Sequence, residues 1–153
     1  MQYDDNIVKN AIDYLENKLT RGVSENMEPF NSYSEAKRFL FLKLGGLEHE
    51  VFSVMFLDNR HRLISYNHMF RGTIDGVGVY PREVVKVALE HNAAAVIFAH
   101  NHPSGDTAPS SSDKTITDRL FGALSLFDIR IVDHIIIGVR LEDTYSFCEK
   151  GIL

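Results

Sequence analysis

The apolar segment from Ala93 to Ala99 constrains the fold more than any other part of this chain. Its sequence, AAAVIFA, contains no charged residue and is far shorter than the about 20 apolar residues that span a bilayer. Apolar residues recur at helical spacing on both sides of it, behind Pro81 and again from Ile116 to Phe127. The segment is therefore predicted to be a buried strand between two helices.

Further strand patterns surround this segment. Residues 50–57 (EVFSVMFL) and 62–67 are rich in β-branched and aromatic residues, and the turn sequence Asp-Asn-Arg-His separates them. This arrangement predicts a hairpin. Two more strands are predicted over residues 129–139 and 144–147. An early hairpin followed by alternating strands and helices predicts an α/β or α+β fold, with a mixed sheet flanked by helices.

The chain of 153 residues fits one domain of ordinary size with a short N-terminal extension. Apolar residues recur at helical spacing early in the chain, and this periodicity is lost over residues 21–30. Ser32 and Glu35 form a capping box that predicts the start of a second helix. We therefore expect an N-terminal helix and connector over residues 1–30 and one domain over residues 31–153.

Charge and cysteine content exclude several classes of protein. Sixteen Lys and Arg residues against 21 Asp and Glu residues give a net charge of -5, which disfavours broad attraction to nucleic acid. The single cysteine, Cys148, permits no internal disulfide or Cys-rich zinc site, and we expect it to be a small buried side chain. With neither a membrane span nor a secretion signal expected, the predicted compartment is the cytoplasm.

A possible metal site follows the central strand directly. In an extended chain, residues two apart project to the same side, so His100 and His102 can point at one ion. Asp113, near the start of the next helix, could complete a set of two imidazoles and one carboxylate. Such a set suits zinc and leaves a fourth position for water. On the spacing alone, a zinc site and a chance pair of strand-end histidines remain equal alternatives.

A site with an activated water also needs a general base. Glu50 begins the first strand, and Glu48 lies one alternation earlier on the same face. Either could be the base, or both could be carboxylates at the open end of the hairpin. Asp106 could orient an imidazole or simply belong to a turn. His134, in an apolar strand, is expected to be a hydrogen-bonded core or edge histidine.

These residues occur in a recognisable order. Glu50, then His100-x-His102, seven residues, Ser110, two residues and Asp113 resemble the JAMM motif of JAB/MPN metallopeptidases. Longer segments resemble the C-terminal domain of the RadC family over roughly residues 31–153: EVFSVMFLD, RGTIDG, VYPREVVKVALEHNAAAVIFAHNHPSGDTAPS and VDHIIIG. The helix-hairpin-helix region that full-length RadC proteins carry ahead of this domain is expected to be missing here.

The resemblance implies a JAB/MPN fold, related to that of cytidine deaminases, and one zinc ion per chain. By this resemblance His100, His102 and Asp113 bind the zinc, with water as the fourth ligand. Glu50 is then the general base, and the Ser110 hydroxyl stabilises the negative oxygen of the tetrahedral intermediate. The implied reaction is hydrolysis of a peptide, isopeptide or other amide bond. Deamination is set aside, because a zinc deaminase needs His-x-Glu and a Cys-x-x-Cys pair.

Two other functions remain open. The RadC name suggests a DNA repair or recombination protein, although the net charge of -5 disfavours nucleic acid as the main partner. A non-catalytic module that binds a partner protein is the other alternative, and the complete motif argues against it. The expected partner is an unknown protein or peptide substrate, without a membrane, and the oligomeric state is left open.

Overall fold

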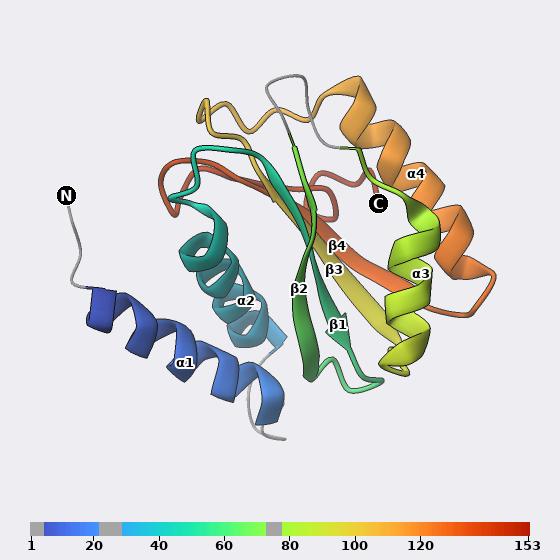
Figure 1. Cartoon of the computed structure of the whole chain (residues 1–153), viewed down its shortest axis with the longest axis horizontal. Helices are drawn as coiled ribbons and strands as arrows, with labels where there is room; N and C mark the ends of the chain where they lie inside the picture. Colours follow the sequence, from blue (N-terminus) through green and yellow to red (C-terminus); the bar gives the residue numbers. More distant parts are fainter. Residues whose placement is uncertain (1–4, 22–28, 73–77) are drawn as a thin grey trace.

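The computed structural model describes residues 5–21, 29–72 and 78–153, which form one mixed sheet with helices on both faces (Figure 1). Along the chain, the elements are α1 (Asp5–Arg21), α2 (Pro29–Leu44), β1 (Val51–Leu57), β2 (Leu63–Arg71), α3 (Pro81–Glu90), β3 (Ala95–Asn101), α4 (Ser111–Ser125), β4 (Arg130–Ile137) and β5 (Thr144–Ser146). Helices α1 and α2 cover one face of the sheet, and α3 and α4 cover the other.

The sheet has the strand order β2-β1-β3-β4-β5. Strands β1 and β2 form the predicted antiparallel hairpin. Strand β1 also pairs antiparallel with the central strand β3, which in turn pairs parallel with β4. A parallel pair needs a long crossover, and α4 provides it. The predicted mixed sheet flanked by helices is therefore confirmed.

The central strand is apolar from Ala95 to Ala99, because both of its faces are covered there. Ala95, Ile97 and Ala99 belong to the cluster that includes α2, whereas Val96 and Phe98 belong to the cluster formed with α3 and α4. Side chains alternate between the faces of a strand. His100 therefore continues the row that faces α3 and α4.

Strand β3 extends beyond the predicted strand and includes His100 and Asn101. Both neighbouring strands continue beside it, since Phe52 of β1 pairs with His100 and Ile137 of β4 pairs with Asn101. Strand pairing on both sides of His100, and with β4 at Asn101, fixes these residues in a rigid element, although the predicted strand ends at Ala99.

The N-terminal helix packs against the domain. Leu15 and Leu19 of α1 are buried in the same cluster as Phe39 and Leu40 of α2. The predicted start of the second helix at Ser32 is wrong, because α2 already begins at Pro29.

Proline fits the first turn of a helix, so Pro29 allows the earlier start. Ser32 therefore lies inside α2 rather than at its cap. Most of the predicted connector, residues 22–28, lies outside the described residues, and the boundary at residue 30 stays a prediction.

The C-terminal part corrects one further prediction. Cys148 is exposed, not buried, because it lies in the turn that follows β5. Its backbone N–H donates to the carboxylate of Asp133, at 2.9 Å. Across the described ranges, no helix is both long enough and apolar enough to cross a membrane.

Candidate metal centre

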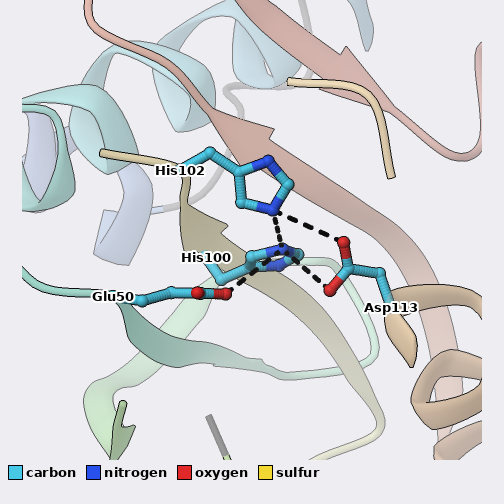
Figure 2. Close-up of side chains that lie close together, drawn as sticks. All are labelled: Glu50, His100, His102 and Asp113. Carbon is cyan, nitrogen blue, oxygen red and sulfur yellow. Dashed lines mark hydrogen bonds and ion pairs between the residues drawn. The ribbon is translucent and has the colours of Figure 1, made fainter. Parts of the chain in front are cut away.

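Strand β3 positions both histidines of the predicted site. His100 is buried near the end of the strand, and His102 follows immediately after it. The backbone N–H of His102 donates to the carbonyl of Ile137, at 2.9 Å, so the chain stays beside β4 for one more residue. The two rings therefore lie on the same side of the sheet, with their Nε2 atoms 3.0 Å apart (Figure 2).

Helix α4 brings Asp113 to the two rings. Ser110 caps this helix, and its hydroxyl oxygen accepts the backbone N–H of Asp113 at 3.0 Å. In return, Oδ2 of Asp113 accepts the backbone N–H of Ser110 at 2.8 Å, which completes a capping box. Oδ1 of Asp113 lies 3.3 Å from His100 Nε2, and Oδ2 lies 3.4 Å from His102 Nε2.

Glu50 approaches the same point from the start of β1. Its Oε1 lies 3.9 Å from His100 Nε2. The backbone on both sides of Glu50 is held by Asn101, whose side-chain oxygen accepts from Val51 N–H at 2.8 Å and whose amide donates to the His49 carbonyl at 2.9 Å. The residue between the two histidines thus fixes the position of Glu50, a contact that the sequence did not predict.

Glu48, the alternative to Glu50, lies elsewhere. It is exposed and is not a member of the group of possible metal ligands, which comprises Glu50, His100, His102 and Asp113 among the described residues. The structure therefore distinguishes two carboxylates that the sequence left equivalent.

The geometry of the group fits a small metal ion. One ligand atom from each of its four residues lies within 4.8 Å of all the others. Tetrahedral coordination with bonds of about 2.0–2.1 Å separates ligand atoms by about 3.4 Å. The two Nε2 atoms are 3.0 Å apart, and each lies 3.3 or 3.4 Å from one of the two Asp113 carboxylate oxygens, close to this value. These three residues could therefore bind one ion, with Glu50 beside them.

A hydrogen bond fixes the orientation of the His102 ring and determines which of its nitrogens carries a hydrogen. Nδ1 of His102 lies 2.7 Å from the carbonyl oxygen of Asp106, and a carbonyl can only accept, so Nδ1 carries the hydrogen and Nε2 is left for a cation. The carboxylate of Asp106 instead accepts from the backbone N–H of Ala108, as a turn residue does. Asp106 therefore orients His102 through its backbone.

The pKa of Asp113 shows that this carboxylate keeps its negative charge beside the two histidines. Burial raises the pKa of Asp113, but its contacts with His100 and His102 outweigh burial and hold this pKa well below the usual range. The hydrogen bond to Asp113 raises the pKa of His102 against the opposing effect of burial. A proton and a metal ion therefore compete for the His102 ring.

Behind His100 lies a second, fully buried histidine. His134 of β4 is hydrogen-bonded in the core, as predicted, but its partner is His100: Nδ1 of His100 and Nε2 of His134 are 2.8 Å apart. Burial, and then the neighbouring His100, lower the pKa of His134 well below its ordinary value and keep the ring neutral. A polar Asp133-His134 pair in a buried strand was the only sequence signal for this contact.

The four residues open onto a cleft of about 940 Å³. Besides them, its lining includes Phe52, Gly78, Val79, Tyr80, Ser110, Ser111, Ser112, Thr115, Ile116 and Arg119. Ser110 is exposed, and the bond from Asp113 N–H uses its oxygen but not its hydroxyl hydrogen. The segment from Arg71 to Tyr80 contributes residues 78–80 to the lining, and its residues 73–77 lie outside the described ranges.

Comparison with known proteins gives a consistent result. Residues 30–152 match the RadC-like JAB domain. A UPF0758 protein of Vibrio cholerae serotype O1 is 50% identical over 151 residues, covering 99% of this chain and 90% of the relative. The UPF0758 protein YfjY of Escherichia coli K12 is 52% identical over 135 residues, covering 88% and 83%. A UPF0758 protein of Marinobacter nauticus is 56% identical over 126 residues, covering 82% of this chain but 55% of that longer relative.

Proposed function

Because this chain belongs to the RadC-like JAB domain family, we propose that it is a zinc-dependent hydrolase that cleaves a peptide, isopeptide or other amide bond of a peptide or protein substrate. The observation that carries the proposal is the convergence of two imidazoles and two carboxylates on one cleft. Three of these groups are spaced as metal ligands, and the fourth stands slightly apart. Metal-assisted hydrolysis requires some residues that bind the metal ion and a separate residue that acts as the base.

In this proposal His100, His102 and Asp113 hold the ion, since two imidazole nitrogens and one carboxylate oxygen form a typical catalytic zinc set. Zinc bound there would polarise a carbonyl group and lower the pKa of a water molecule to about 7. The protein contributes rigidity, because one histidine lies within β3 and the aspartate is tied into the capping box of α4.

Glu50 acts as the general base. Its carboxylate lies 3.9 Å from His100 Nε2, farther out than the three ligands, and 24% of its side chain remains exposed at the cleft. A carboxylate so placed can take a proton from the attacking water and deliver it to the leaving nitrogen. Asn101 holds the backbone beside it, and the Glu50 carbonyl accepts from Gly72 N–H at 2.8 Å, so the base is anchored at the hairpin.

Ser110 and the walls of the cleft receive the substrate. The Ser110 hydroxyl hydrogen is available to an oxygen that gains negative charge in the reaction. Phe52, Val79 and Ile116 provide apolar surface along the same cleft. A peptide chain, with alternating polar backbone and apolar side chains, suits this lining.

The test compares zinc content and hydrolysis in the same preparations. We expect the parent to hold one zinc per chain and the His100→Ala/His102→Ala variant to hold none. Glu50→Gln is expected to retain zinc while cleavage of a library of quenched fluorescent peptides and isopeptides falls by about 100-fold or more. Elemental analysis and initial rates measure the two quantities.

Glu48→Gln is the matched control, since Glu48 is exposed and lies outside the cluster. It is expected to keep both the zinc and the rate of the parent. Loss of zinc in Glu50→Gln would make Glu50 a ligand instead of a base. Undiminished cleavage by that variant would exclude Glu50 from the reaction.

A further inference from the structure

Two buried polar side chains behind His100 form a continuous row of hydrogen bonds. His134 is fully buried and Thr117 of α4 is 2% exposed. From the metal site inward, His100 Nδ1 lies 2.8 Å from His134 Nε2, and His134 Nδ1 lies 2.7 Å from Thr117 Oγ1. Thr117 Oγ1 in turn lies 2.7 Å from the carbonyl oxygen of Asp113. The row therefore begins at one possible metal ligand and ends at the backbone of another.

The last contact fixes the direction of every bond in the row. Two oxygens 2.7 Å apart need a hydrogen between them, and because a carbonyl only accepts, the Thr117 hydroxyl must supply it. The Thr117 oxygen is then the acceptor for His134, so Nδ1 of His134 carries the hydrogen. Nε2 of His134 is consequently an acceptor, and Nδ1 of His100 must donate to it. When the His100 ring is neutral, its remaining nitrogen, Nε2, therefore carries no hydrogen.

The surroundings of His134 reinforce this arrangement. Its ring stacks on Phe147 at 4.6 Å between centroids, and it makes T-shaped contacts with Phe52 and Phe98, whose centroids lie 5.6 and 5.9 Å away. Polar groups that are buried among apolar rings lose much free energy when a hydrogen bond is broken. These hydrogen bonds are therefore expected to keep one direction of donation, from His100 to His134, to Thr117 and to the Asp113 carbonyl.

We propose that His134 and Thr117 are positioning residues that fix the tautomer of His100, so that its Nε2 always presents a lone pair to the metal. This inference rests on the metal site of the proposed function. Without the row, a neutral imidazole can carry its hydrogen on either nitrogen, and a hydrogen on Nε2 blocks metal binding. Partners that orient ligating histidines are known to raise metal affinity.

The first experiment requires neither zinc nor substrate. Long-range ¹H–¹⁵N correlation spectra of metal-free protein at pH about 8, above the ordinary histidine pKa, report which ring nitrogen carries the hydrogen. We expect the hydrogen on Nδ1 in both His100 and His134. A hydrogen on Nε2 of His100 in the parent would overturn the proposal, whatever the protein hydrolyses.

The second experiment breaks the row at its far end. Thr117→Val removes the hydroxyl with little change in shape, so His134 loses its acceptor and can donate from Nε2 instead. His100 Nδ1 must then accept, and the hydrogen of His100 moves to Nε2. We expect this change of tautomer in the spectra, together with an about 10- to 100-fold loss of zinc affinity in competition with a chelating indicator.

Thr117→Ser retains the hydroxyl and is expected to keep the tautomer and zinc affinity of the parent. Equal zinc affinity in the Val and Ser variants, with the tautomer unchanged, would overturn the proposal. A second pair guards against misfolding: the oxygen of His134→Gln can still accept from His100, whereas His134→Leu cannot. If both variants unfold cooperatively on heating, the His134→Gln protein is expected to bind zinc more tightly than the His134→Leu protein. The reverse order of zinc affinity would contradict the role of His134.

Discussion

At the scale of single residues, one buried carboxylate ties α2 to the C-terminal part of the sheet. Asp133 of β4 is fully buried and accepts hydrogen bonds from the hydroxyls of Tyr33 and Ser146 and from the backbone N–H groups of His134 and Cys148. Burial, and then the bond to Asp133, raise the pKa of Tyr33 and keep its hydroxyl protonated as a donor. All four of these groups therefore donate hydrogen bonds to the Asp133 carboxylate.

Asp133→Asn is predicted to destabilise the fold. The amide has the same size, but it loses the charge and turns one acceptor into a donor that faces other donors. We expect the free energy of unfolding to fall by about 2–4 kcal/mol, as measured by urea unfolding. Tyr33→Phe removes one donor only and is expected to cost about 1–2 kcal/mol. An Asn variant as stable as the parent would show that the charge contributes nothing.

At the scale of elements, the start of α4 both caps the helix and positions one residue of the candidate metal site. Ser110 satisfies a free N–H group of the first turn, and the same capping box orients Asp113 toward the two histidines. Stability and metal binding should therefore change together when the cap is removed.

Ser110→Ala is predicted to lower the free energy of unfolding by about 1 kcal/mol and to weaken zinc binding. Ser110→Asn keeps a capping oxygen without the hydroxyl, so it should retain stability and zinc affinity. Ser110→Ala is also expected to hydrolyse the substrate more slowly, because it lacks the donor to the negative oxygen, whereas the side-chain amide of Ser110→Asn can still donate. Chemical unfolding and zinc titration measure the two effects, and an Ala variant with unchanged stability would contradict the role of the cap.

The elements also show what could be predicted from the sequence. The apolar runs of β1 and β3, the two-residue spacing of His100 and His102 and the place of Asp113 near the start of a helix are local patterns, and the structure brings His100, His102 and Asp113 together. The contacts of Asn101, Thr117 and His134 depend instead on β1 and β4 pairing with β3 and on how α4 packs. The Val51–Asn101, His100–His134 and Thr117–His134 contacts join residues 50, 34 and 17 positions apart, and no short pattern encodes them.

At the scale of the whole molecule, the candidate metal site connects three separate segments. Its residues come from the start of β1, the end of β3 and the first turn of α4. The unfolded chain does not hold these residues together, so an ion that binds only the folded state stabilises it.

We predict that zinc raises the melting temperature of the protein. At a zinc concentration about 1,000 times the dissociation constant, the gain is about 4 kcal/mol, which is about 10 °C for a chain of this size. Thermal unfolding with added zinc, and again with a chelator, measures the shift. The His100→Ala/His102→Ala variant should show none, and an unshifted parent would contradict metal binding at this site.

The side chains of β3 point alternately to the two faces of the sheet, and this has a consequence for how the sequence can evolve. His100 and His102 face the cleft, while Asn101 between them faces the opposite layer and holds the backbone beside Glu50. Inserting or deleting one residue between Ala95 and Ala99 would exchange these faces, moving Asn101 into the cleft and both histidines away from it. Selection can therefore replace apolar side chains in this strand by others of similar size, but it must preserve the number of residues.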